Sequence, residues 1–235
     1  MLLHDTLLAM SISLGVMTVG MQSWSDLRAS QQSAQALEQM HAQQREVQRL
    51  LERISLSAGA TRVSASPGGA LQWVAKSAPL SGMEGAHDDT LTWGVPREID
   101  PRDCQGNQAS SQDQIGHQFK LSAKQELSCK DNLRPGTLFQ ALAERVEDLQ
   151  AQYAEASIWV GADPAQAPLQ WKSAEQVLDW RQVRAVHLCL RWASPTKVWQ
   201  ASASTAGCQD ETVAADGRLR RLQRTTLWLA SQGDG

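Results

Sequence analysis

The chain has 235 residues, of which 42% are hydrophobic, and its 22 basic and 25 acidic side chains give a formal net charge of -3. This balance provides no overall electrostatic reason to expect nucleic acid or an anionic membrane surface as a partner, so either would need a local basic patch. A chain of this length can bury one sizeable core, and we expect one globular domain with a long helix outside it.

The N-terminal segment is apolar over an unusual length, because no residue from Thr6 to Ser25 carries a charge. Twenty helical residues span ~30 Å, which is about the hydrocarbon thickness of a bilayer. The segment lacks the basic lead-in and the clear cleavage site of an ordinary secretory signal. We therefore predict that residues 1–25 form a membrane anchor that remains in the mature protein.

Asp5 lies immediately before this apolar run. A carboxylate in lipid is costly unless it has a partner, and a suitable partner is the free amino group of a neighbouring chain, which belongs to Met1. We therefore predict that Asp5 and Met1 are subunit-assembly residues. The alternative is that Asp5 only caps the start of the helix at the membrane interface, where it would interact favourably with the helix dipole.

Residues 26–58 show the period of an amphipathic helix. The apolar positions recur every three or four residues and are Leu37, Met40, Val47, Leu50, Leu51, Ile54 and Ala58. Charged side chains fill the intervening positions, and no proline interrupts the pattern. We predict a single helix of roughly 55 residues whose second half packs on the globular domain. Gly59 and the segment Pro67–Gly69 are expected to end it.

Residues 59–235 are predicted to form the globular domain, and their pattern is typical of short strands rich in Trp, Val, Leu and Thr. The expected strands are Leu71–Ala75, Thr90–Val95, His117–Ser122, Arg184–Trp192, Lys197–Ala201 and Arg220–Leu229. The segment Leu138–Tyr153 has helical composition with a strand-compatible end. The whole pattern predicts an α+β protein in which a long N-terminal helix is followed by an antiparallel sheet.

The four cysteines all lie beyond the anchor, and they are Cys104, Cys129, Cys189 and Cys208. Their spacing matches no metal-binding motif, so we predict disulfides and no metal site. The sequence-local pairing Cys104–Cys129 and Cys189–Cys208 would close two modest loops, each stabilising by roughly 2–4 kcal/mol if the domain lies in an oxidising compartment. The other two connectivities remain open.

Two further groups of side chains could bind a partner. The chain has nine tryptophans beside one tyrosine and two phenylalanines. We expect most of them in the core and Trp24 at the membrane interface, but an exposed pair could stack on sugars or on a partner protein. The basic run Arg218, Arg220, Arg221 and Arg224 could contact phosphate, but it equally suits the solvent face of an edge strand, so nucleic acid is not an expected partner.

Catalytic motifs are missing from the sequence: it contains no nucleophile elbow, HExxH, phosphate loop or dinucleotide fingerprint. The five histidines are scattered along the chain, and the adjacent acids Asp88 and Asp89 are more typical of a solvated turn than of a calcium site. We therefore expect a protein that is not an enzyme and that needs no cofactor.

The N-terminus resembles that of type IV pilins after removal of their short leader. Residues 1–10 (MLLHDTLLAM) lie along the family's Phe-Thr-Leu-Ile-Glu-Leu-Met-Val-Ala-Leu/Met pattern, and Asp5 falls on the family's glutamate. The chain departs from the pattern at His4, which replaces an aliphatic residue, and in the missing basic leader that ends in glycine. Met1 is therefore either a start residue or the first residue after leader cleavage.

The rest of the chain resembles one branch of these proteins, the PilW family of minor type IV pilins. The segments that carry the resemblance follow the family's order and are residues 49–59 (RLLERISLSAG), 88–92 (DDTLT), 103–106 (DCQG) with 127–129 (LSC), 145–153 (RVEDLQAQY), 177–186 (VLDWRQVRAV) and 216–221 (DGRLRR). Each segment alone is weak, but six in one order across nearly the whole chain are far more specific.

The resemblance implies a subunit of low abundance that helps to initiate pilus assembly and lies at or near the fibre tip. Its N-terminal helix would bundle with those of other minor and major pilins, after residing in inner-membrane lipid with the domain in the periplasm. Two alternatives remain open, namely a minor pseudopilin of a type II secretion system, which has the same rod and anchor, and a membrane-tethered periplasmic binding domain unrelated to fibres.

Overall fold

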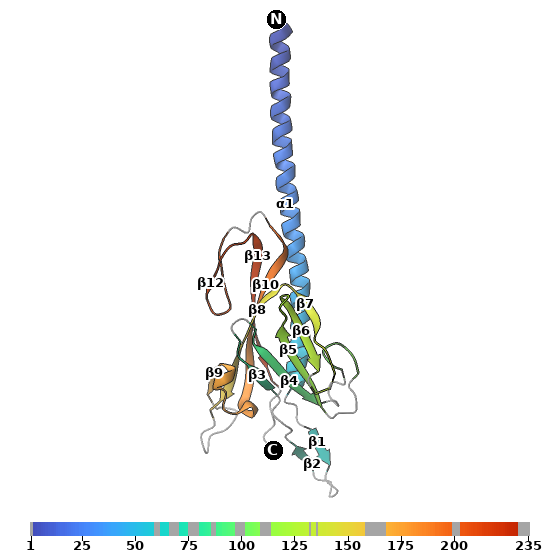
Figure 1. Ribbon diagram of the computed structural model, residues 1–235, viewed down its shortest axis with the longest axis vertical. Coiled ribbons are helices and arrows are strands. Elements are labelled where there is room, and N and C mark those ends of the chain that lie inside the picture. The colour runs from blue at the N-terminus through green and yellow to red at the C-terminus, as the bar shows by residue number, and fades with distance from the viewer. Residues whose placement is uncertain are drawn as a thin grey trace.

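A computed structural model gives the fold of the chain and describes residues 2–58, 62–65, 71–74, 80–85, 88–96, 102–108, 114–131, 133–134, 136–157, 168–198 and 203–229. Within this range the side chains of residues 2–9, 11–14, 62–65, 71–74, 80, 96 and 114 lie outside the description. The molecule consists of one long helix and an antiparallel β domain that packs against the C-terminal part of that helix (Figure 1).

Helix α1 runs from Leu2 to Ser57 without interruption, as its composition predicts. Its 56 residues correspond to a length of ~84 Å. The N-terminal half projects beyond the domain, and the C-terminal half lies among the strands (Figure 1). Within the described residues, no helical stretch combines the length and the hydropathy needed to cross a bilayer. Gly59 and Pro67–Gly69, the expected stop signals, lie outside the described residues.

The first large sheet has five strands in the order β3-β4-β5-β6-β7, so each strand pairs with its neighbour in sequence. Its strands are β3 (Leu80–Met83), β4 (Thr90–Pro96), β5 (Gln114–Leu121), β6 (Glu126–Asp131) and β7 (Gln140–Glu144). All pairs are antiparallel. Arg145, with a φ of 64°, ends this sheet and turns the chain directly into the second one.

The second large sheet has four antiparallel strands in the order β13-β10-β8-β9. Its strands are β8 (Val146–Ala156), β9 (Leu169–Lys172), β10 (Val183–Lys197) and β13 (Arg218–Trp228). Between β9 and β10 lie two short 3-10 helices, η2 (Ala174–Gln176) and η3 (Trp180–Gln182). Two small hairpins, β1 (Arg62–Ala65) with β2 (Leu71–Val74) and β11 (Thr205–Ala206) with β12 (Thr212–Val213), complete the fold.

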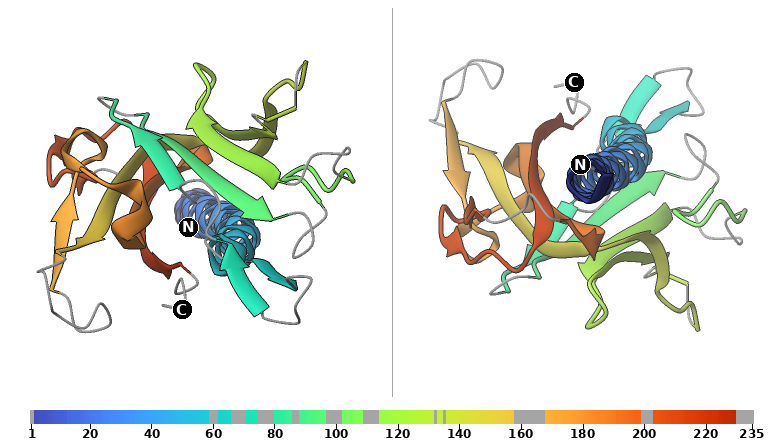
Figure 2. Two further views of the ribbon diagram at one scale, coloured as in Figure 1. Left: turned by 90° about the horizontal axis from the view of Figure 1, so that it is seen from below. Right: turned by 90° about the horizontal axis from the view of Figure 1, so that it is seen from above.

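The core lies between α1 and the two sheets. Seen along the helix, strands β10 and β13 lie on one side of α1 and the five-stranded sheet on another (Figure 2). The buried helix residues fall in one cluster with residues of both sheets, and this cluster includes Val47, Leu51, Ile54, Leu91, Phe119, Val186, Leu188 and Leu227. The predicted amphipathic spacing is therefore confirmed, and it serves to bury one stripe of the helix.

Asp89 joins the two sheets at the start of β4. Asp88 forms an isolated parallel bridge with Leu149 of β8, and the Asp89 N–H donates to the Leu149 carbonyl at 3.0 Å. The Asp89 carboxylate in turn accepts from the Ala151 N–H at 2.7 Å and from the Gly85 N–H at 2.8 Å. Asp89 is therefore a buried structural residue, whereas Asp88 lies exposed beside it.

Most of the expected strands are present, but the expectation for Leu138–Tyr153 is wrong in its helical part. Gln140–Glu144 forms β7, and Val146–Tyr153 belongs to β8. Strand β8 is rich in Ala, Gln, Leu and Glu, which favour helices, yet it pairs with β10 and β9 along both edges. Tertiary pairing has overridden local propensity. The unexpected strands are β1, β3, β6, β9, β11 and β12. Of the expected strand Lys197–Ala201, Lys197 is the last residue of β10, Val198 is not in a strand, and residues 199–202 lie outside the description.

Candidate functional site

The projecting half of α1 presents apolar side chains to its surroundings. Each of these large hydrophobic residues is more than half exposed: Met10, Val16, Met17, Val19, Met21, Trp24 and Leu27. Burial on the domain begins only at Ala36, which is the first buried residue along the described part of the helix. A run of exposed apolar groups on a rigid helix is a surface suited to burial in lipid or against other helices.

The two predicted assembly residues lie at the start of this helix. The backbone of Asp5 is helical, whereas its side chain and the whole of Met1 lie outside the described residues. The proposed carboxylate–amine pair between subunits therefore stays a prediction. Trp24, expected at the membrane interface, lies exposed with the Arg28 guanidinium 5.1 Å from its ring centroid.

Strand β13 fixes the domain against α1 through polar side chains as well as through the core. Arg221 contacts His41 of the helix, and the Gln223 amide donates to Gln48 Oε1 at 3.4 Å. Gln223 also accepts from the indole N–H of the buried Trp192 at 2.9 Å. These contacts define which face of the helix the domain occupies.

The basic run of β13 is compensated by carboxylates within the domain. Arg220 donates to both Glu147 oxygens, at 2.7 and 3.2 Å, and to both Asp216 oxygens, at 2.8 Å each. Arg224 pairs with Asp210 at 2.8 Å. The hydrogen bond from Arg220 lowers the pKa of Asp216 to about 2, and Glu147 raises the pKa of Arg220 above its ordinary value. The run therefore supports the domain's own structure.

Arg191 of β10 extends this network into the buried part of the sheet. Its guanidinium lies 3.4 Å from Glu147, 3.3 Å from Asp148 and 2.7 Å from Glu211. Arg191, Glu147 and Asp148 are nearly buried, so their charges interact in a low-dielectric environment. The sequence pattern did not predict this cluster, because its residues come close together only through the pairing of β8 with β10.

Both pairs of cysteines form disulfides, with the sequence-local connectivity. Cys104 is joined to Cys129 with the two Cα atoms 6.3 Å apart, and Cys189 to Cys208 with the Cα atoms 5.7 Å apart. The first fastens the 102–108 loop to β6, and the second fastens the loop after β11 to β10. His117 lies close to the Cys104 and Cys129 sulfur atoms, but both sulfurs are bonded to each other and neither is a thiolate that could bind a metal.

The 102–108 loop has a specific backbone geometry. The Asp103 carboxylate accepts from the backbone N–H of Gln105 at 2.9 Å and of Asn107 at 2.8 Å. Gly106 has a φ of 83°, a conformation that favours glycine, and its N–H donates to the Asp103 carbonyl. The Asp103–Gly106 segment therefore forms a tight turn that presents Cys104 to Cys129.

Burial raises the pKa of Asp89 to about 6, although its two backbone hydrogen bonds act in the opposite direction. Burial also raises the pKa of Tyr153, which packs edge-on against Trp180 with the ring centroids 4.8 Å apart. Asp89 lies between the end of β3 and β8, and Tyr153 of β8 lies between β3 and η3. They stabilise the junction of the two sheets and are not exposed for binding.

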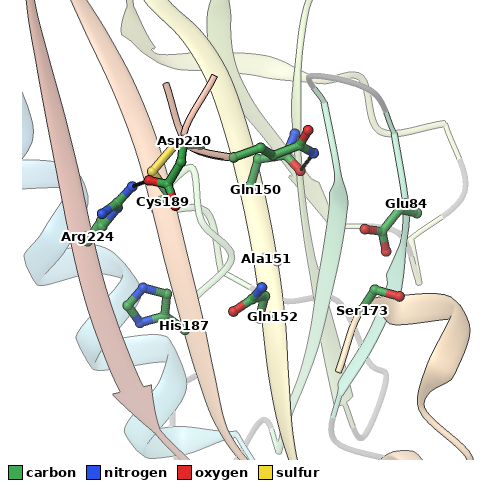
Figure 3. Close-up of a pocket in the computed structure, with 11 residues that line it drawn as sticks. Glu84, Gln150, Ala151, Gln152, Ser173, His187, Cys189, Asp210 and Arg224 are labelled. Carbon is green, nitrogen blue, oxygen red and sulfur yellow. Dashed lines mark hydrogen bonds and ion pairs between the residues drawn. A yellow bond between two sulfur atoms is a disulfide. The ribbon is translucent and has the colours of Figure 1, made fainter. Parts of the chain in front are cut away.

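A polar pocket of about 460 Å3 lies on the face of the four-stranded sheet opposite α1 (Figure 3). His187 of β10, Gln152 of β8 and Arg224 of β13 form its floor. The second disulfide and the adjacent loop border it, and Glu84 and Ser173 lie at its other side (Figure 3). This pocket was not predicted, since its residues come from six separate segments of the chain.

The tryptophans divide between the core and the surface. Trp93 and Trp192 are fully buried, and Trp180 packs against the core. Trp24, Trp171 and Trp228 are exposed. The side chains of Trp73, Trp159 and Trp199 lie outside the described residues.

Comparison with known proteins agrees with the fold. The family model described as "Type IV Pilus-assembly protein W" matches residues 118–231, a segment that contains β6, β8, β10 and β13. Among solved structures, a type IV-like pilin from Thermus thermophilus superposes with a TM-score of 0.50 and 12% sequence identity, over 81% of this chain and 97% of that one. At this identity the likeness shows the fold alone. The comparison with curated proteins gave no match.

These findings confirm the resemblance inferred from the sequence. The matched segment contains all four strands of the sheet β13-β10-β8-β9, and the superposed pilin has the same arrangement of a long helix with an antiparallel domain. The chain is therefore similar to type IV pilus-assembly protein W over residues 118–231, and it has a type IV pilin-like fold.

Proposed function

We propose that the protein is a minor pilin that takes part in the assembly and initiation of type IV pili, at or near the fibre tip. The observation that carries this proposal is the projecting half of α1 with its exposed apolar side chains from Met10 to Leu27. The family match points to the same system. The role is structural and not catalytic.

The projecting helix would act in two environments. Before assembly it would lie in inner-membrane lipid, with the β domain in the periplasm, where both disulfides could form. During assembly the helix would leave lipid and pack against the helices of other minor and major pilins. Apolar packing supplies little preference for one axial position, because lipid tails are as apolar as the helices themselves.

Asp5 would provide that preference. A carboxylate in the apolar bundle would pair with the amino group of Met1 on a neighbouring subunit, and an unpaired charge there would cost ~3–5 kcal/mol. Only one axial offset between neighbouring helices brings these two groups together. The pair would therefore set the register of the helices.

The test is complementation of a deletion strain with single variants, followed by a count of surface pili. Asp5→Ala should reduce piliation by more than about tenfold, which corresponds to the loss of a buried ion pair. Asp5→Glu should restore it, because the charge is kept. The matched control is Asp26→Ala, which removes an exposed carboxylate from the same helix.

Normal piliation with Asp5→Ala would refute the ion-pair register. A deletion strain that keeps its pili but fails to export proteins would instead show a pseudopilin of a type II secretion system. The intact mass of the membrane-extracted protein would show whether a leader has been removed ahead of Met1 and whether the terminal amine is modified.

A further inference from the structure

The face of the four-stranded sheet that is turned away from α1 carries an ordered array of side chains. Residues paired across neighbouring antiparallel strands point to the same face. The register therefore gives three rows on this face, which are Arg224–Cys189–Gln150, Thr226–His187–Gln152 and Trp228–Ala185–Ala154–Trp171. The alternate residues, such as Val186, Leu188 and Leu227, face the core.

The third row has an exposed tryptophan at each end and alanines between them. Trp228 is 57% exposed and Trp171 is 46% exposed, whereas Ala185 and Ala154 are fully buried. Three strand spacings separate β13 from β9, so the two tryptophan backbones lie ~14 Å apart. The exposed surface of this row therefore belongs to the two tryptophans at its ends, because the alanines between them are covered.

The second row supplies hydrogen-bonding groups next to the tryptophans. The imidazole of His187 is held by Thr226, with Nδ1 and Oγ1 3.0 Å apart, and it lies edge-on to Trp171 with ring centroids 5.9 Å apart. Gln152 is exposed, and its amide has no hydrogen bond among the described residues. One oriented ring and one free amide therefore line the pocket (Figure 3), and the ring also contacts Trp171 in the neighbouring row.

The charges at the pocket are largely compensated. Arg224 is paired with Asp210, and Glu84 accepts the N–H of Ala174 at 2.9 Å. The Cys189–Cys208 disulfide and the hydrogen bond from Gln209 to Gln150, at 2.9 Å, hold the bordering loop in place. The site is therefore preformed, polar and without a surplus cation that would select an anionic ligand.

We propose that this face binds a neutral oligosaccharide. Sugar rings have apolar C–H faces that stack on tryptophan and hydroxyl groups that both donate and accept, which suits the amide of Gln152 and the imidazole of His187. The two tryptophan backbones lie ~14 Å apart, so an oligosaccharide that contacts both must have several linked rings. This activity would be additional to the assembly role and does not depend on it, because none of these residues lies on α1.

The test uses the full chain in detergent micelles and measures binding of defined probes by saturation-transfer-difference NMR and calorimetry. The probes are trisaccharides of α- and β-linked glucose, N-acetylglucosamine, galactose and mannose. At least one should bind, and Trp171→Ala, Trp228→Ala and Gln152→Ala should each weaken that binding about 3- to 10-fold. Trp171→Tyr keeps an aromatic platform and should retain most of the affinity.

The matched control is Trp24→Ala, which removes an equally exposed tryptophan from the projecting helix and should leave sugar binding unchanged. Circular dichroism of each variant separates lost binding from lost folding. The proposal is overturned if the wild-type chain binds none of the probes at 10 mM, or if binding survives loss of both tryptophans. Loss of piliation in Trp171→Ala, with no sugar binding by the wild-type chain, would instead assign this face to a contact between subunits.

Discussion

Gly82 illustrates how a single residue fixes the approach of one sheet to the other. Strand β3 crosses the fully buried ring of Tyr153 at this glycine, and a Cβ atom there would overlap the tyrosine hydroxyl and lie 2.7 Å from Cζ. The ring has little room to move, because it packs against Trp180 on its other side. The glycine is needed for close approach, not for an unusual backbone angle.

Gly82→Ala should therefore destabilise the domain by about 1–3 kcal/mol, the usual cost of forcing an extra carbon into a packed site. The measurement is urea unfolding followed by tryptophan fluorescence, since Trp93 and Trp192 are fully buried reporters. Ser81→Ala, at the exposed neighbouring position, should change stability by less than about 0.5 kcal/mol. Equal stability of the two variants would contradict the role given to Gly82.

At the scale of elements, β8 is the strand on which the domain depends. It pairs with β10 and β9, bonds to Asp89 next to β4, and carries the acids that pair with Arg191 and Arg220. Glu147 is shared between these two arginines, and its side chain is only 7% exposed. Removing its charge would leave two nearly buried guanidinium groups short of a partner.

We expect Glu147→Gln to lower the free energy of unfolding by ~3–5 kcal/mol. Removing one carboxylate from a buried ion network leaves the remaining charges without full compensation. Thermal unfolding of the variant and of Glu144→Gln, an exposed acid three residues earlier, provides the comparison. If both variants unfold at the wild-type temperature, the network contributes nothing to stability.

The elements could be predicted from sequence where periodicity was strong and local. The helix was recognised over its whole length, because apolar spacing from Leu37 to Ala58 and the absence of proline both favour it. Strand β10 was recognised from its run of Val, Leu and Trp. Strand β8 was partly misassigned, since its alanines and glutamines favour a helix and only the pairing with β10 makes it a strand. Pairing information is not contained in a local window of sequence.

The candidate sites show the same limit at the scale of the whole molecule. Asp5 and the cysteines are visible in the sequence, because a lone acid before an apolar run and an even set of cysteines are conspicuous on their own. The third row on the outer face of the sheet could not be predicted in this way, because only the strand order brings its members together. They are Trp228, Ala185, Ala154 and Trp171. The sequence indicated that an exposed tryptophan pair could bind sugars, but it did not indicate which pair.

The whole domain should also respond to pH through Asp89, where the two sheets meet. Its folded pKa of about 6 exceeds the ordinary value of 3.8, so between these values the folded state holds a proton that the unfolded chain has lost. The free energy of unfolding should therefore fall as pH rises from about 4 to about 6, by at most about 3 kcal/mol. Above about pH 6 the ionisation of Asp89 should cause no further change.

Urea unfolding at pH 4.5, 5.5, 6.5 and 7.5 tests this response. Asp89→Asn cannot ionise, so its stability should lack this decrease, although the variant is less stable overall because an amide cannot accept both backbone N–H groups. Acids with lowered pKa values, such as Asp216 with a pKa of about 2, have the opposite effect, which is lost only at lower pH. Identical pH slopes for the two proteins would show that Asp89 does not titrate in this range.

The polar contacts between β13 and α1 fix how the domain would be oriented in any fibre built from this chain. Arg221 with His41, and Gln223 with Gln48, lock the azimuth of the domain around the rod. The sheet turns its core face to the rod and its tryptophan-bearing face the opposite way. If several rods gathered about a common axis, the tryptophan-bearing face would thus be turned away from its own rod, and the fixed azimuth would repeat that direction in every copy.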